Sequence, residues 1–139
     1  MSWDELCTQI TRQTGCIPFS GVGIGIRKSE KLAILRSVDN TSYYADDLSD
    51  MDHPVYTLFG HNGDQSKEEI RYNEPLLNPA KTEHIYLYRV LTKRKNKKRE
   101  YVWYGKYEID DIQPKQHPGK DLVLRTIYLV TLKRIKRNV

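Results

Sequence analysis

The sequence predicts an α+β domain dominated by strands, with one helix at the start of the chain. Two observations support this class. Several short segments alternate apolar and polar residues with period two and are rich in β-branched and aromatic residues, and the clearest helical periodicity lies at residues 2–14. With 139 residues the chain suffices for one ordinary domain but not two. We expect the strands to form one sheet that curls into a barrel.

The helix predicted at residues 2–14 has a defined beginning and end. Ser2 and Glu5 form a capping box, and Gly15 follows as the stop signal. Its apolar side chains recur at the spacing of one helix face, at Trp3, Leu6, Cys7 and Ile10.

Six further segments are interpreted as strands, and two as irregular or loop regions. Residues 22–26 alternate apolar residues with glycine, which predicts a strand that another segment approaches closely. Further strands are expected at residues 31–38, 54–59, 84–91, 100–108 and 122–132. Residues 61–80 are predicted to be irregular to helical, and a Pro/Gly-containing loop is expected at residues 113–120.

The net charge of +5 suits a polyanionic partner, although many basic proteins bind none. Much of this charge lies between two predicted strands, in a hairpin loop that contains Lys93, Arg94, Lys95, Lys97, Lys98 and Arg99. Such a loop is compatible with contacts to DNA phosphates. A solvated hairpin tip explains it equally well, and both interpretations stay open.

Five short motifs occur in order along the chain and together resemble the SRA (SET- and RING-associated), or YDG, family. They are Tyr44-Ala45-Asp46-Asp47, Tyr56-Thr57-Leu58-Phe59-Gly60, Asp64-Gln65, Asn73-Glu74-Pro75-Leu76 and Tyr104-Gly105-Lys106-Tyr107. The resemblance covers roughly residues 17–135. It implies a PUA-like, SRA-type curled β-barrel with a few short helices, in a single domain over residues 1–139 with a basic tail at 133–139.

The resemblance also implies a function. Such a module binds double-stranded DNA and flips a modified cytosine, of the 5-methyl or 5-hydroxymethyl class, into an aromatic pocket. It has no catalytic residue, no metal and no cofactor of its own. Carried over to this chain, Tyr44 and Tyr56 are the stacking walls, Asp47 accepts from the exocyclic amine of the cytosine, and Thr57 shapes the space around the modification. Two glycines, Gly60 and Gly63, let the backbone approach a phosphate.

The chain departs from the animal members of the family in its length after Gly60. Only a few residues separate Gly60 from Asp64-Gln65, so the long finger loop is absent. Leu58-Phe59 stands where the family has smaller residues, and Tyr104-Gly105 lacks the family's aspartate. The short layout is similar to SRA-like domains fused to nucleases in modification-dependent restriction enzymes, which implies a nuclease or other effector acting in trans.

Two alternatives from other classes remain open. The same PUA-like barrel can serve as an RNA- or protein-binding module. A compact metal-dependent nuclease is the second alternative, because His61-Asn62 resembles half of an HNH motif, but no second histidine or acid lies at the required spacing. The acidic start of the chain and the absence of an apolar run of about 18 residues lead us to expect an intracellular protein, cytoplasmic or nuclear, not associated with a membrane.

Overall fold

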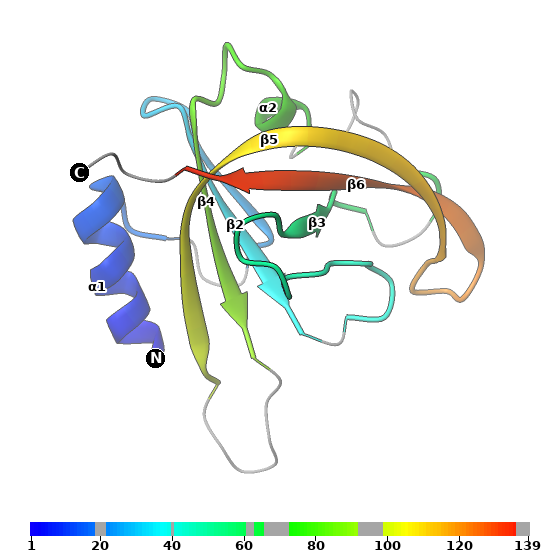
Figure 1. The fold of residues 1–139 in the computed structure, drawn as a ribbon, viewed down its shortest axis with the longest axis horizontal. Coiled ribbons are helices and arrows are strands. Elements are labelled where there is room, and N and C mark those ends of the chain that lie inside the picture. Colours follow the sequence, from blue (N-terminus) through cyan, green and yellow to red (C-terminus); the bar gives the residue numbers. More distant parts are fainter. Residues whose placement is uncertain (19–21, 40, 61–62, 66–72, 92–98, 136–139) are drawn as a thin grey trace.

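The described part of the chain forms one six-stranded mixed sheet with two helices (Figure 1). The computed structural model describes residues 1–18, 22–39, 41–60, 63–65, 73–91 and 99–135. The strands lie in the order β1-β2-β4-β5-β6-β3. The elements are α1 (Trp3–Thr14), β1 (Ile24–Arg27), β2 (Leu32–Val38), β3 (Val55–Thr57), α2 (Asn73–Leu77), β4 (His84–Val90), β5 (Tyr101–Pro118) and β6 (Leu124–Arg134).

The sheet is open, which corrects the expectation that it curls into a barrel. Strands β2 and β4 pair in parallel, and every other neighbouring pair is antiparallel. The edge strands β1 and β3 do not pair with each other among the described residues. A side chain links these edges instead, since the Tyr56 hydroxyl donates to the carbonyl oxygen of Gly23 at 2.9 Å. In the described residues, this side-chain hydrogen bond takes the place of the backbone hydrogen bonds that would join β1 to β3 in a closed barrel.

The helix α1 confirms the sequence prediction. Ser2 is the N-cap with a complete capping box to Glu5, and Gly15 takes the left-handed conformation at the C-terminal end, with φ of 74°. Leu6 and Ile10 are fully buried against the sheet, in a cluster that includes Leu32, Ile34, Tyr86, Tyr88 and Val90. This helix therefore covers one face of β2 and β4.

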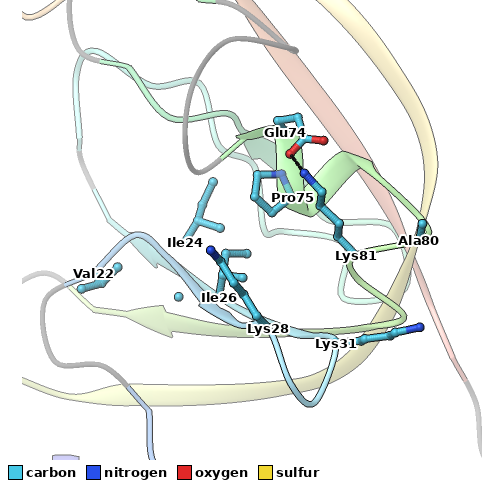
Figure 2. A pocket seen from close by; sticks show the side chains of 10 residues that line it. Val22, Ile24, Ile26, Lys28, Lys31, Glu74, Pro75, Ala80 and Lys81 are labelled. Atoms are coloured by element: carbon cyan, nitrogen blue, oxygen red, sulfur yellow. Dashed lines mark hydrogen bonds and ion pairs between the residues drawn. The ribbon is translucent and has the colours of Figure 1, made fainter.

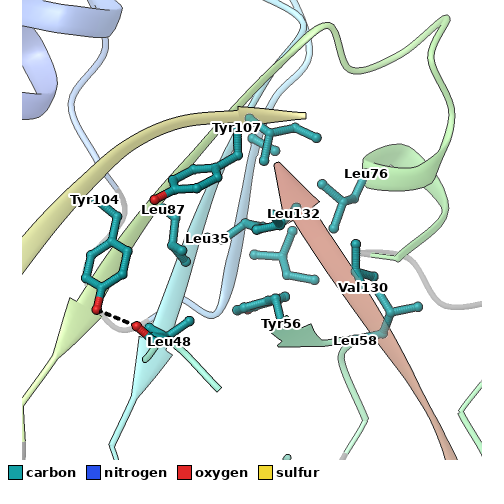
Figure 3. Packing of buried hydrophobic residues seen from close by; sticks show 13 residues of the cluster. Leu35, Leu48, Tyr56, Leu58, Leu76, Leu87, Tyr104, Tyr107, Val130 and Leu132 are labelled. Atoms are coloured by element: carbon teal, nitrogen blue, oxygen red, sulfur yellow. Dashed lines mark hydrogen bonds between the residues drawn. The ribbon is translucent and has the colours of Figure 1, made fainter. Parts of the chain in front are cut away.

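A second and larger core fills the other face of the sheet (Figure 3). All six strands contribute to it, through residues such as Ile24, Leu35, Tyr56, Leu87, Tyr107 and Leu132. Strands β2 and β4 are thus buried on both faces, which explains why their sequences are nearly continuous apolar runs.

Strand β5 is much longer than predicted. The sequence analysis ends it at residue 108 and expects a loop at 113–120, whereas β5 continues to Pro118 and pairs with β6 up to Leu124. The loop prediction failed because proline usually interrupts a sheet. Beyond Tyr107, however, β5 has no strand on its other side among the described residues, so Pro114 removes no ladder hydrogen bond. The two strands form a long arch that points away from α1 (Figure 1).

The remaining differences are of length. β3 spans three residues where the sequence suggests six, and α2 spans five residues within the segment expected to be irregular to helical. Within the described ranges, no helix is long and apolar enough to cross a membrane.

Candidate functional site

A cavity of about 470 Å³ lies where β2 ends, between Asp39, the segment 41–49 and the side chain of Arg89 on β4. Its lining is mainly polar and includes Ser37, Asp39, Tyr44, Asp46, Asp47 and Arg89. Three of these belong to the Tyr44-Ala45-Asp46-Asp47 motif. The structure therefore places that motif at a concave surface.

The segment that carries the motif is fixed from below by tyrosines of β5. Tyr104 donates its hydroxyl to the carbonyl oxygen of Leu48 at 3.1 Å (Figure 3), and Tyr107 donates to that of Met51 at 2.7 Å. The backbones of Asp47 and Val55 also exchange two hydrogen bonds, of 2.9 and 2.8 Å. Contacts from the core and from β3 thus help to fix the position of the motif.

The carboxylate of Asp46 accepts hydrogen bonds from within the protein. It accepts from the Ser37 hydroxyl at 2.6 Å and from the Thr57 main-chain N–H at 2.7 Å. Burial raises the pKa of Asp46, and these hydrogen bonds partly oppose the rise. The Thr57 hydroxyl in turn accepts from the main-chain N–H of Ala45 at 2.9 Å. Thr57 therefore holds the motif segment in place from beneath the cavity.

Asp47 is the carboxylate that faces solvent. Its Oδ1 accepts from the main-chain N–H of Ser49 at 3.0 Å and from the Ser49 hydroxyl at 2.6 Å. These bonds lower the pKa of Asp47, so the group is ionised at neutral pH. The other oxygen, Oδ2, takes part in none of the hydrogen bonds between described residues and is open to an external donor.

Tyr44 supplies an aromatic side to the same cavity. Its hydroxyl accepts from the main-chain N–H of Gly60 at 3.2 Å, and desolvation raises its pKa to about 12. Its ring lies edge-on to Tyr43, with 4.8 Å between the ring centres. The ring is therefore held at both its edge and its hydroxyl.

Tyr56, the second predicted wall, does not line the cavity. Its side chain is 5% exposed, belongs to the larger core, and has its hydroxyl bonded to the carbonyls of Gly23 and Arg36. The structure thus brings Tyr44 and Asp47 together at the cavity and places Tyr56 and Thr57 in the layer behind them. A base could stack directly on Tyr56 only if this ring left the core.

An ion pair missed by the sequence analysis closes the far side of the cavity. Arg89 donates to both carboxylate oxygens of Asp39, at 2.7 and 2.8 Å. The bond to Asp39 raises the pKa of the guanidinium, which stays charged. In the sequence, Arg89 is one polar residue within a predicted strand, and nothing indicates which side chain it binds. Only the structure therefore reveals its pair with Asp39.

The segment around Gly60 is held by an unusually polar set of contacts. The carbonyl of Leu58 accepts from Gln65 Nε2 at 2.6 Å, and Phe59 exchanges hydrogen bonds of 2.8 and 3.0 Å with the side-chain amide of Asn73. These hydrogen bonds fix the residues that follow β3. Gln65 and Asn73 both belong to motifs that carry the resemblance. Gly60 and Gly63 have positive φ angles of 136° and 70°, a backbone conformation that favours glycine.

Arg125 on β6 joins this segment to the cavity and was also missed by the sequence analysis. Its guanidinium donates to the carbonyl oxygens of Gly60, Tyr43 and Gly63, at 2.6, 2.7 and 3.3 Å. The side chain is only 2% exposed. Burial of a charged guanidinium costs free energy, which its hydrogen bonds to main-chain carbonyls offset. Through these bonds Arg125 fixes the segment of Gly60 and Gly63 relative to Tyr43.

The predicted phosphate-binding loop lies almost entirely outside the described residues. Lys93, Arg94, Lys95, Lys97 and Lys98 belong to the range 92–98, and of this set only Arg99 is described; it is exposed. Their proposed role remains a prediction.

A second and larger cavity, of about 680 Å³, lies at the opposite end of β2 (Figure 2). Its floor is apolar, with Ile24, Ile26 and Pro75, and lysines surround it. One of them, Lys81, is paired with Glu74 at 2.7 Å. No residue predicted to bind DNA lines this cavity, so we assign the candidate site to the smaller one, where the motif residues meet. No group of three or more His, Cys, Asp or Glu side chains within the described ranges is arranged to hold a metal ion.

The arrangement of the sheet and helices is that of SRA domains, as comparison with solved structures shows. The sequence itself matches no family model and no curated protein. KRYPTONITE, solved in complex with mCHG DNA and SAH, aligns with a TM-score of 0.59 and 23% identity over 85% of this chain. The MspJI restriction endonuclease, solved with a 27-mer oligonucleotide, aligns with a TM-score of 0.65 and 14% identity over 86% of this chain.

A third similar structure holds the sulfur-binding and SRA domains of ScoMcrA with phosphorothioated DNA. It aligns with a TM-score of 0.59 and 19% identity over 92% of this chain. The present chain covers 28%, 34% and 37% of the KRYPTONITE, MspJI and ScoMcrA chains, respectively. At identities this low, the alignments establish the fold alone, and the fold is that of SRA domains.

Proposed function

We propose that this chain binds double-stranded DNA and takes a modified cytosine out of the duplex into the cavity bounded by Tyr44, Asp46 and Asp47. One observation carries the proposal: Tyr44 and Asp47 line the same cavity, on a fold shared with proteins solved on modified DNA. Asp47 is ionised there, and its Oδ2 takes part in none of the hydrogen bonds between described residues. A flipped base needs these two partners, because it has lost both its pairing and its stacking.

The free oxygen of Asp47 suits the exocyclic amine of cytosine. The amine is a donor that points away from the base, and a carboxylate accepts from it more strongly than a neutral group does. Since the hydrogen bonds from Ser49 lower the pKa of Asp47, the acceptor keeps its charge well below neutral pH. The same bonds fix the carboxylate before a ligand arrives.

Tyr44 provides the stacking surface in this proposal. Tyr56 becomes the opposite wall if its ring turns out of the core when a base enters, and Thr57, whose hydroxyl holds Ala45, shapes the floor. Backbone contacts to the extruded nucleotide come from Gly60 and Gly63. The loop 93–99 adds phosphate contacts that give affinity without sequence information.

The proposed module reads DNA and performs no reaction, so a nuclease or another effector in trans would act on the bound site. The chain covers well under half of the KRYPTONITE, MspJI and ScoMcrA chains.

The direct experiment is a gel-shift series on one duplex that carries cytosine, 5-methylcytosine or 5-hydroxymethylcytosine at a single site. We expect at least one modified duplex to bind 10-fold or more tightly than the unmodified one. Equal binding to all three, or full competition by RNA of the same length, would contradict the proposal. Cleavage of a modified duplex by the isolated chain with Mg²⁺ would show that it is a nuclease instead.

A further inference from the structure

The turn between β5 and β6 presents three consecutive apolar side chains to solvent. Leu122, Val123 and Leu124 are 82%, 62% and 64% exposed. Contiguous exposed apolar residues are uncommon on a soluble protein and indicate a surface that is covered in a complex. None of the three belongs to either core cluster of the described residues, so packing of the core does not explain their apolar character.

The backbone of the turn places Leu122 in a strained conformation. Leu122 N–H donates to the carbonyl of Gly119 at 3.0 Å, and Gly119 N–H donates to that of Val123 at 2.9 Å, which closes a tight turn. Leu122 has a φ of 66°, in the left-handed region where turns of this kind favour glycine or asparagine. Backbone conformations of this kind cluster at binding and switch sites.

This tip is attached to the segment that forms the cavity. His117 Nε2 lies 2.8 Å from the carbonyl oxygen of Ser42, and Lys120 Nζ lies 5.9 Å from the centre of the Tyr43 ring. Both contacts are made within two residues of Tyr44. The residues beside the apolar tip therefore contact the segment that leads directly into Tyr44, a residue of the candidate cavity.

We infer that Leu122, Val123 and Leu124 form an apolar wedge that enters the stack of base pairs beside the extruded nucleotide. This inference rests on the proposed function. Extrusion of a base costs a few kcal/mol in lost stacking, and proteins that distort DNA offset such a cost by inserting leucine, isoleucine or similar side chains between base steps. Two exposed lysines, Lys115 near the end of β5 and Lys120 in the turn itself, precede these side chains in the chain and could meet the phosphates of the opened step.

The test uses a variant that keeps the turn but removes its apolar character: Leu122→Asn, Val123→Thr and Leu124→Thr. Asparagine tolerates the left-handed conformation and threonine keeps the strand preference, so the variant should unfold at the parent's temperature or above. Ile17→Thr, which changes a side chain that is 68% exposed elsewhere on the chain, is the matched control.

Binding is measured by titrating two duplexes that carry the same modified cytosine, one paired normally and one with an abasic site opposite it. We expect the triple variant to lose 10-fold or more in affinity for the paired duplex and less than 3-fold for the duplex with the abasic site, where extrusion is already easy. A 2-aminopurine next to the modified base should brighten with the parent and the control, and stay dim with the variant.

The outcomes separate this inference from the proposed function. If the parent protein does not prefer modified DNA, the proposed function fails. If the parent does prefer it and the triple variant binds both duplexes like the parent, the wedge is overturned while the reader remains. Equal losses on the two duplexes would place the tip outside the stack and also overturn the wedge. A parent dimer that the variant converts to a monomer would assign the tip to self-association instead.

Discussion

Arg125 and Gly60 lie 65 residues apart in the chain and are joined by a hydrogen bond of 2.6 Å from the guanidinium Nη1 to the glycine carbonyl oxygen. The same side chain binds the carbonyl of Tyr43 at 2.7 Å. One buried arginine thus connects β6 to the residue before Tyr44 and to Gly60, whose N–H donates to the Tyr44 hydroxyl.

Replacing Arg125 should therefore affect both stability and the site. Arg125→Met leaves three main-chain carbonyls without this donor, and we expect a loss of about 3 kcal/mol in the free energy of unfolding. Arg125→Lys, which cannot reach all three oxygens, should lose less. Urea unfolding of the two variants measures the difference. A change of under about 0.5 kcal/mol for Arg125→Met would show that these hydrogen bonds do not hold the two segments.

Asp46 and Asp47 are neighbours with opposite roles, and stability should distinguish them. Asp46→Ala leaves the Ser37 hydroxyl and the Thr57 N–H without an acceptor and should cost about 2–3 kcal/mol. Asp46→Asn keeps an acceptor and should recover much of that loss. Asp47→Ala removes only bonds to the exposed Ser49 and should cost less than about 1 kcal/mol. Thermal unfolding of the three variants tests this order, and a reversed order would contradict the assignment of Asp46 as the structural carboxylate.

The protein should lose stability in alkali. Desolvation raises the pKa values of Tyr44, Tyr88 and Tyr107 to about 12, from an ordinary value of 10.0. Between about pH 10 and pH 12 the unfolded chain therefore holds fewer protons than the folded chain, and the free energy of unfolding falls as the pH rises. Urea unfolding at several pH values should give no such decline below about pH 9. Tyr44→Phe should make the decline shallower, and a curve that stays flat up to pH 12 would contradict the burial of these hydroxyls.

The basic loop at residues 93–99 can be tested without knowledge of its structure. If its side chains touch phosphates, replacing Lys95, Lys97 and Lys98 by glutamine should reduce the slope of log affinity against log salt by about three. The preference among cytosine modifications should stay the same, because phosphate contacts carry no sequence information. An unchanged slope would mean that the loop does not contact the DNA.

Local patterns predicted the local elements of this fold well. The cap at Ser2, the stop at Gly15 and the alternating strands all depend on neighbouring residues, and the structure contains them. The parallel pairing of β2 with β4, the open sheet and the extension of β5 through Pro114 depend on contacts between distant segments. A single sequence does not encode those contacts in any short motif.

The same distinction applies to the candidate site. The Tyr44-Ala45-Asp46-Asp47 motif lies in a segment that lines a cavity, yet the sequence could not show that Asp46 faces inward and Asp47 outward. It also could not show that Tyr56 is buried, because its spacing from Tyr44 fits a core residue and a pocket wall equally well. Arg89 and Arg125 are ordinary strand residues in sequence, and only their long-range hydrogen bonds reveal their roles.

The central claim, that Asp47 recognises a flipped cytosine, is tested most directly by the affinity of Asp47→Ala for modified and unmodified duplexes. The exocyclic amine would lose its acceptor in the pocket, at a cost of about 1–3 kcal/mol, so binding to the modified duplex should weaken about 5- to 100-fold. Binding to the unmodified duplex should barely change.

Asp50→Ala is the control, because Asp50 is an exposed acid close to Asp47 that does not line the cavity. On a protein that attracts DNA only by its positive charge, removing either acid would slightly strengthen binding. The two accounts therefore predict changes of opposite sign. Weaker binding by Asp47→Ala alone, on modified DNA alone, is the result that the base-flipping account predicts. Equal or tighter binding of modified DNA by both variants would contradict it.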